Sequence, residues 1–318
     1  MNYRRVAVIG ASGFIGRYVV KRLAGRGIIV TAIMRDAEAG GFLATMGDVG
    51  QIARLSVNIT DPKALTAALE GQDAVVNLVG ILFESGRAGF DAIHQEGAGR
   101  VARIAKAAGV RAFVHISALG ADPASPSHYG RSKAAGEAAV HAAFPEAVIL
   151  RPSVVFGPED SFFNRFAEMS RISPALPLIG GGHTRFQPVY VGDVADAVMK
   201  ALDQPEAAGK IFELGGPHVY TFRQVLELVL KLTNRSRKLV NLSWGRANLL
   251  ARFMEWLPNP PLTHDQILLL GHDNVVGASA LTFADLGIKP SAAEAILPAY
   301  MDRYARGGWY GKHQKGTK

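Results

Sequence analysis

The sequence predicts an α/β fold, a Rossmann-type doubly wound parallel sheet with a smaller C-terminal α+β lobe. Residues 4–9 read as a buried strand, since Val6-Ala-Val-Ile9 has no polar alternation, and a glycine-rich turn follows at once. Similar segments alternate with helical patterns as far as residue 151, which is typical of a parallel sheet. We therefore place a large domain at residues 1–180 and a smaller lobe, partly threaded back onto the sheet, at residues 181–318.

The composition excludes several classes of protein. Hydrophobic residues make up 48% and charged residues 19% of the 318 residues, which excludes disorder as the general state. The chain has no cysteine, so disulfides, a thiolate metal site and a cysteine nucleophile are excluded, and we expect no metal site. An excess of 35 Lys and Arg over 27 Asp and Glu suggests an anionic partner: nucleic acid, an acidic membrane surface or a phosphorylated ligand.

The glycine-rich turn is the first candidate binding site. Gly10 permits a tight turn out of the strand, Gly13 lets the backbone approach a pyrophosphate, and Gly16 lets the next helix pack close to the sheet. The N-terminus of that helix offers free N–H groups and a partial positive charge to phosphates. The order strand, turn, helix, strand therefore predicts a dinucleotide-binding unit. The contacts that we expect here are Gly10, Ser12, Gly13, Phe14, Ile15 and Gly16.

The end of the second strand, residues 28–34, bears on the choice of dinucleotide. NAD-binding proteins usually place an acidic residue there to hold the ribose 2′-hydroxyl. Here Met34 takes that place, and Arg35 and Asp36 follow. Because Arg35 can pair with a 2′-phosphate, we expect NADP(H) to be preferred. Asp36 could still hold a ribose, so NAD(H) stays open.

The middle of the chain continues the alternation. Residues 53–57, 73–78 and 111–116 have the apolar pattern of strands, and residues 88–109 have the pattern of a long helix. Asp61 stands directly before a proline and is predicted to cap a further helix.

A second candidate site follows the strand at residues 111–116. Ser117 comes directly after it, and Tyr129 and Lys133 share one face of the next helix. A lysine ammonium beside a phenol favours the phenolate, so Tyr129 could act as acid or base on a carbonyl or alcohol oxygen. Ser117 could donate a hydrogen bond to the same oxygen. Ser117, Tyr129 and Lys133 are therefore the candidate catalytic residues.

These motifs resemble those of extended or atypical short-chain dehydrogenases/reductases, which are epimerase/dehydratase-like. The glycine turn, Ser117, Tyr129-x-x-x-Lys133 and Arg151-Pro-Ser-Val-Val-Phe-Gly-Pro158 carry the resemblance. It implies that Lys133 also holds the nicotinamide ribose. The other cofactor contacts that it implies are Asn58 and Ile59 at the adenine, Leu78, Val79 and Gly80 in the central cleft, Pro152 and Val154 near the nicotinamide, and Tyr129.

The sequence departs from the family pattern at His94. Many extended members carry an asparagine there, which helps to position the catalytic lysine through water. His94 could substitute for it, or it could be a core histidine with satisfied hydrogen bonds.

Longer stretches resemble a narrower group, the NADPH-binding accessory subunits of respiratory complex I and their bacterial relatives. They include residues 14–20, 143–149, 157–164 and 186–193, with shorter matches at 263–266 and 273–276. Such subunits resemble dehydrogenases but are thought to hold NADPH structurally. The resemblance therefore implies a bound cofactor without turnover, and a respiratory membrane complex as partner.

The C-terminal part offers one unusual segment, residues 244–257. It reads as an amphipathic helix with two tryptophans, Trp244 and Trp256, and two arginines, Arg246 and Arg252. Such a helix could cover a substrate pocket, or it could meet lipid or a membrane-bound partner. The basic C-terminal tail would add attraction to an anionic membrane surface. We expect no nucleic-acid partner, because no zinc finger, basic run or aromatic–basic strand motif is present.

Two functions remain open. The first is an NADP(H)-dependent oxidoreductase acting on a small apolar carbonyl or alcohol, or on a sugar-like or quinone-like molecule. The alternative is a non-catalytic NADPH-binding accessory or assembly subunit of NADH:quinone oxidoreductase. No signal-peptide core and no transmembrane stretch is evident, so we expect a cytoplasmic protein, with a peripheral position on the inner membrane as the variant that the second function implies.

Overall fold

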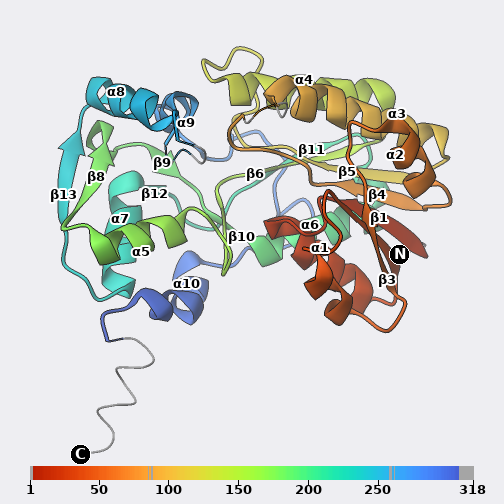
Figure 1. Cartoon of the computed structure of the whole chain (residues 1–318), viewed down its shortest axis with the longest axis horizontal. Coiled ribbons are helices and arrows are strands. Elements are labelled where there is room, and N and C mark those ends of the chain that lie inside the picture. Colours follow the sequence, from red (N-terminus) through yellow and green to blue (C-terminus); the bar gives the residue numbers. More distant parts are fainter. Residues whose placement is uncertain (1–2, 85, 87–88, 258–259, 261, 308–318) are drawn as a thin grey trace, which may run out of the picture. The chain divides into compact units, whose positions relative to one another are not determined.

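A computed structural model describes the chain except for residues 1–2, 85, 87–88, 258–259, 261 and 308–318 (Figure 1). The chain divides into two compact units. Unit 1 consists of Met1–Pro152, Val191–Leu214 and Gly277–Lys289, and unit 2 of Ser153–Tyr190, Gly215–Val276 and Pro290–Lys318. The first boundary falls after Pro152, whereas the sequence analysis placed it after residue 180. The reason is strand pairing, because the short strands within residues 155–190 pair with one another or with later strands of unit 2.

Unit 1 is built on a seven-stranded sheet of order β11-β6-β5-β4-β1-β2-β3, in which all pairings are parallel. The predicted doubly wound parallel sheet is therefore confirmed. The order turns at β1, which pairs with β2 on one side and β4 on the other, so that a topological switch point lies at its carboxyl end. The strands are β1 (Arg5–Ile9), β2 (Ile29–Met34), β3 (Ile52–Ser56), β4 (Ala74–Asn77), β5 (Ala112–Ile116), β6 (Val148–Pro152) and β11 (Ile211–Leu214).

Helices cover both faces of this sheet. Figure 1 shows α2, α3 and α4 on one face and α1 and α6 on the other. They are α1 (Phe14–Gly25), α2 (Pro62–Leu69), α3 (Ala98–Ala107), α4 (His128–Ala143) and α6 (Val191–Asp203), with short turns η1 (Gly41–Met46) and η4 (Pro205–Ala207). The Asp61 side chain accepts the Lys63 and Ala64 N–H groups, which confirms it as the cap of α2. The helix expected at residues 88–109 begins with a π-helical turn, η2 (Asp91–Gly97), and continues as α3.

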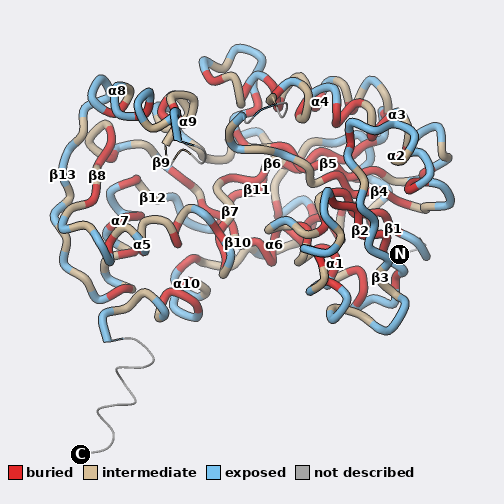
Figure 2. Tube along the Cα trace, in the orientation of Figure 1, coloured by how far each residue is buried: buried red, intermediate tan, exposed pale blue. Residues whose placement is uncertain are grey.

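The core of unit 1 explains why the central strands read as unbroken apolar runs. Figure 2 shows buried residues along β1, β4 and β5. Ala7, Val75 and Phe113 are buried on these strands and join one core with the inward faces of α2, α3 and α4. Strands that are covered on both faces need no polar alternation, and this is the pattern the sequence shows.

Unit 2 combines short strand pairs with helices. Its pairs are β7 with β10, β9 with β12 and β8 with β13. Two aromatic-rich cores lie beneath α5 and α7. The elements are β7 (Val155–Phe156), α5 (Phe163–Ile172), β8 (Ala175–Ile179), η3 (Gly180–Gly182), β9 (Arg185–Phe186), β10 (Val189–Tyr190), β12 (Tyr220–Thr221), α7 (Phe222–Leu232), β13 (Lys238–Leu242), α8 (Trp244–Met254), α9 (His264–Leu270), α10 (Ala293–Met301) and η5 (Asp302–Tyr304).

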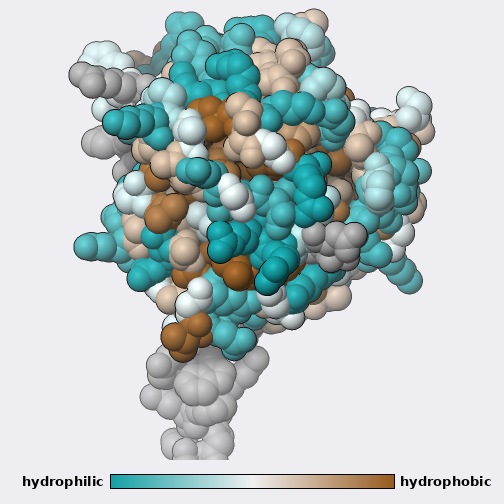
Figure 3. Space-filling view, turned by 90° about the vertical axis from the view of Figure 1, so that its right-hand side faces the viewer, coloured by the Kyte–Doolittle hydropathy of each residue, from teal (hydrophilic) through white to brown (hydrophobic). Residues whose placement is uncertain are grey.

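The helices that the structure describes are too short or too polar to span a membrane. None of them combines the length and the apolar character that crossing a bilayer requires. On the side of the molecule in Figure 3, hydrophilic residues dominate and hydrophobic ones form separate small patches.

Candidate dinucleotide site

The turn between β1 and α1 has the geometry of a phosphate-binding turn. Gly10 has a φ of +84°, which side chains rarely adopt, and its N–H donates to the Ile33 oxygen at 2.9 Å. A Cβ atom on Gly16 would collide with the carbonyl oxygens of Gly10 and Ala11, so the helix can pack here only with glycine. Gly13 is the N-cap of α1, and no side chain caps the helix. The first N–H groups of α1 are thus left to bind a ligand.

The remaining turn residues lie where the sequence placed them. Ser12 is partly exposed, and its carbonyl oxygen accepts a hydrogen bond from Arg17 Nη2 at 3.3 Å. Phe14 and Ile15 form the first turn of α1 and are also partly exposed.

The residues after β2 differ in how they are engaged. Asp36 Oδ1 accepts the N–H groups of Glu38 and Ala39 at 2.9 and 3.0 Å, so this carboxylate caps the following turn. Arg35 is exposed, and its guanidinium has no hydrogen-bond partner among the described residues. The cation is therefore free to meet an anion, whereas one oxygen of the acid is used locally.

The predicted cofactor contacts after β3 and β4 also differ in how far they are exposed and engaged. Asn58 is exposed, but Ile59 is buried in the core, and its carbonyl oxygen accepts a hydrogen bond from Arg100 at 3.0 Å. Leu78 and Val79 are partly buried, and Gly80 is exposed. A Cβ on Gly10 would lie 3.3 Å from the Leu78 carbonyl carbon, which brings the ends of β1 and β4 together at the switch point.

The three candidate catalytic residues lie at the ends of β5 and the start of α4. Ser117 follows β5 and is 3% exposed, and its Oγ is buried with no hydrogen-bond partner among the described residues. Lys133 is 5% exposed, and its Nζ donates to the Ile116 oxygen at 3.1 Å, one residue before Ser117. Tyr129 lies in the first turn of α4, which the Ser127 hydroxyl caps by accepting the Gly130 N–H. A buried hydroxyl without a partner is rare, so the Ser117 hydroxyl is able to bind a further polar group.

The electrostatics of Lys133 suit a binding site for an anionic or hydroxyl-rich group. Burial lowers the pKa of Lys133 to about 8, and the nearby Glu137 carboxylate opposes this effect. A Cβ on Gly80 would lie 3.7 Å from Lys133 Nζ and 3.6 Å from His94 Nε2. The ammonium therefore faces the end of β4, close to the switch point.

His94 is held on both sides of its ring. Its Nε2 accepts the Ile81 N–H at 3.0 Å, and its Nδ1 lies 2.9 Å from the Ser132 hydroxyl, which itself donates to the Tyr129 oxygen at 2.8 Å. Nδ1 must therefore carry the proton. Burial and the Lys133 ammonium lower the pKa of His94 to about 3, so the ring is neutral at physiological pH. Its ring also stacks on Phe90 and meets the Tyr129 ring edge-on.

Sequence reasoning missed several residues that support this site. Phe90 packs against Tyr129 with ring centroids 5.7 Å apart, and Ser132 links His94 to the Tyr129 backbone. Glu137 of α4 binds Arg151 of β6 through two hydrogen bonds of 2.9 and 2.6 Å. Ser132 and Glu137 stand one residue before and one turn after Lys133, a spacing that could have suggested them.

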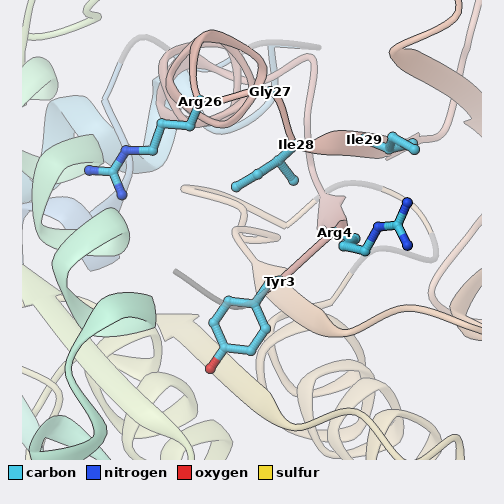
Figure 4. A pocket seen from close by; sticks show the side chains of 6 residues that line it. All are labelled: Tyr3, Arg4, Arg26, Gly27, Ile28 and Ile29. Atoms are coloured by element: carbon cyan, nitrogen blue, oxygen red, sulfur yellow. The ribbon is translucent and has the colours of Figure 1, made fainter.

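The last two predicted contacts fall in different units. Pro152 ends β6, and its carbonyl oxygen accepts the N–H of Leu119 at 2.9 Å. Leu119 stands two residues after Ser117 in the chain. Val154 belongs to unit 2, so its proximity to the nicotinamide stays a prediction. A separate hollow of about 210 Å³, lined by Tyr3, Arg4 and residues 26–29, lies at the amino end of β1 and the start of β2, away from the glycine turn (Figure 4).

Comparison with known proteins defines the class. Residues 6–215 match the model of the NAD dependent epimerase/dehydratase family, and the chain belongs to that family. The predicted short-chain dehydrogenase/reductase-like fold with NAD(P) binding is thereby confirmed. The residues of unit 1 fit such a cofactor. The turn at Gly10 and the uncapped start of α1 offer backbone N–H groups to phosphates, and the Ser117 Oγ has no other hydrogen-bond partner among the described residues.

Individual relatives and one solved structure show where the similarity extends beyond the family model. The chain is 36% identical over 313 residues to NADH dehydrogenase (ubiquinone) 1 alpha subcomplex subunit 9, mitochondrial, of Arabidopsis thaliana, covering 95% of this chain and 78% of that protein. It is 33% identical over 190 residues to ceramide reductase of Caulobacter vibrioides, covering 60% and 58%. Among solved structures, dTDP-glucose 4,6-dehydratase DesIV of Streptomyces venezuelae with NAD bound has a TM-score of 0.72 at 20% identity, covering 94% and 96%. The likeness to this dehydratase, at 20% identity, shows a shared fold alone.

Proposed function

We propose that the protein is an NADP(H)-binding accessory or assembly subunit of NADH:quinone oxidoreductase. One observation carries the proposal: the likeness to the alpha subcomplex subunit 9 extends over 95% of this chain, and so includes unit 2 as well as the dinucleotide-binding unit. A shared cofactor domain alone would explain similarity within unit 1. Similarity throughout unit 2 supports a shared partner or role.

We infer a preference for NADP(H). Arg35 is exposed at the end of β2 and can pair with a 2′-phosphate, whereas Asp36 Oδ1 already accepts two backbone N–H groups. The N–H groups at the start of α1 would hold the pyrophosphate, and Lys133 would hold the nicotinamide ribose. NAD(H) remains the competitor in the test.

A second candidate function is an oxidoreductase acting on an apolar carbonyl or alcohol, or on a quinone-like or sugar-like molecule. The retained Ser117, Tyr129 and Lys133 favour it, together with the likeness to a ceramide reductase, whose name denotes a lipid substrate. The cofactor, when bound, would supply hydride chemistry. Tyr129 would pass its phenolic proton to the substrate oxygen, and Ser117 would donate a hydrogen bond to the same oxygen.

The accessory role implies a location. We place the protein on the cytoplasmic side of the inner membrane, peripheral to the respiratory complex. Cell fractionation tests this directly: recovery with washed membranes that depends on the presence of the complex supports the placement, and recovery in the supernatant of cells that contain the complex contradicts it.

The Tyr129→Phe variant separates the two functions. The phenol oxygen is needed for proton transfer, but the ring and Lys133 remain to bind the cofactor. In a deletion strain, full recovery of NADH:quinone oxidoreductase by Tyr129→Phe supports the accessory role, and failure to recover it with the cofactor still bound supports catalysis.

A second measurement removes dependence on the cellular readout. The purified protein should retain NADPH through dialysis and should not oxidise it when quinones or ketones are added. Lys133→Met serves as the control, because it should lose the cofactor in either case. Rapid oxidation of NADPH by the native protein but not by Tyr129→Phe would overturn the accessory proposal.

A further inference from the structure

One helix face in unit 2 is apolar and exposed. Helix α8 buries its small residues Ala247 and Ala251 completely. Its opposite side and the turn that follows expose large apolar side chains. These residues, called here the α8 apolar surface, are Leu249 (59% exposed), Leu250 (42%), Phe253 (70%), Trp256 (91%) and Leu257 (52%).

The helical part of this surface forms a second stripe on α8. Leu249 and Phe253 stand at positions i and i+4, which share one face of α8, and Trp256 and Leu257 lie in the turn beyond its last residue, Met254. The alanine pair is also spaced i, i+4, on the other side of α8. A helix with one stripe packed in its own fold and another stripe of aromatic and leucine side chains in water presents the second stripe for contact with something else.

The two tryptophans of this region have different roles. Trp244 packs against Gly180, since a Cβ atom on that glycine would collide with the indole ring, and Gly180 has a φ of +58°. This contact fixes the beginning of α8 to η3. Trp256, by contrast, is 91% exposed. Trp244 therefore anchors the helix, and Trp256 is the tryptophan of this region that is available for contact with a partner.

The charge around the α8 apolar surface is positive. Arg246 and Arg252 are exposed on α8, and Glu255 is the one acidic residue among residues 244–257. The Glu255 carboxylate accepts the His264 N–H at 2.6 Å, which ties it to the start of α9. Unit 2 as a whole has 15 Lys and Arg against 9 Asp and Glu, whereas unit 1 has 20 against 18. Most of the basic excess thus belongs to the unit that carries this surface.

We propose that the α8 apolar surface inserts into the boundary between headgroups and acyl chains of an anionic membrane. Aromatic and leucine side chains flanked by arginines are the pattern of helices that lie in this boundary. A protein partner is less favoured, because a standard interface uses roughly 20–30 residues a side, and this surface has five apolar side chains on one short helix and the turn after it. The proposal holds whether the protein is an accessory subunit or an enzyme.

The experiment is sedimentation of the purified full-length protein with phosphatidylcholine vesicles, with and without phosphatidylglycerol. Binding should require phosphatidylglycerol and weaken with salt. The double variant Phe253→Ser/Trp256→Ser should bind phosphatidylglycerol vesicles about tenfold or more weakly. Val49→Ser is the matched control, since Val49 is fully exposed in unit 1 and its replacement should change nothing.

Arg246→Gln/Arg252→Gln tests the charge separately and should reduce the preference for phosphatidylglycerol. Unfolding midpoints of all variants, followed by circular dichroism, confirm that the exposed replacements leave the fold intact. Equal binding by Phe253→Ser/Trp256→Ser and the native protein would overturn the proposal. Absence of vesicle binding by the native protein would also overturn it. If, in that case, the double variant were also lost from the isolated respiratory complex, the surface would be a contact with another protein.

Discussion

Replacing Arg151 with methionine is expected to destabilise unit 1 by about 3–5 kcal/mol. The Arg151 guanidinium binds the Glu137 carboxylate through two hydrogen bonds and lies 3.5 Å from Glu213 Oε1. The Glu137 side chain is 6% exposed, so its carboxylate cannot regain water when the cation is removed. Removing one partner of a buried ion pair leaves an uncompensated charge, and that charge is the source of the expected cost.

Urea unfolding followed by far-ultraviolet circular dichroism measures this cost. All three tryptophans of the sequence, Trp244, Trp256 and Trp309, fall within the ranges of unit 2, so tryptophan fluorescence reports on the unit that the substitution does not touch. The double variant Glu137→Met/Arg151→Met removes both charges and should be more stable than Arg151→Met alone. A cost below about 1 kcal/mol for Arg151→Met, or a double variant less stable than the single one, would refute the reasoning.

Three further outcomes are expected. Because the folded pKa of His94 is about 3 against 6.5 unfolded, the unfolded chain binds more protons between these values, and stability should fall on acidification through that window by up to about 1.4 kcal/mol per pH unit; His94→Gln should flatten this profile in acid unfolding. Lys133 loses its charge above about pH 8, so NADPH retention in dialysis should weaken there, while stability of the ligand-free protein rises towards pH 10.5. Arg35→Ala should weaken NADP binding about tenfold or more and leave NAD binding unchanged in titration calorimetry.

The sequence was informative wherever chemistry depends on neighbours in the chain. The turn at Gly10, the cap at Asp61 and the placement of Tyr129 and Lys133 on one helix all depend on spacings of a few residues, so each could be predicted. The division into units could not be read in this way. It depends on two-residue strands such as β7 and β10, whose pairing joins Val155 to Val189 and leaves no periodic pattern.

Some residues of the candidate site could not be predicted from the sequence for a related reason. Glu137 and Arg151 meet because α4 packs beside β6, and their separation of 14 residues follows no local rule. The π-helical turn at Asp91–Gly97 was also invisible, since an extra residue in a helical turn changes no composition signal. Yet this turn contains His94 and therefore shapes the surroundings of Tyr129 and Lys133.

The hydrogen bonds of His94 limit its part in proton transfer. A proton relay must accept a proton at one atom and release one at another. His94 Nε2 accepts from the Ile81 backbone N–H, which does not give up its proton, and the Nδ1 proton goes to the Ser132 hydroxyl, whose own proton is donated to the Tyr129 carbonyl oxygen. The pKa of about 3 also means that His94 does not gain a second proton near neutral pH. These contacts therefore hold the His94 ring in one tautomer at the side of the Tyr129 ring and give it no part in passing a proton to Tyr129.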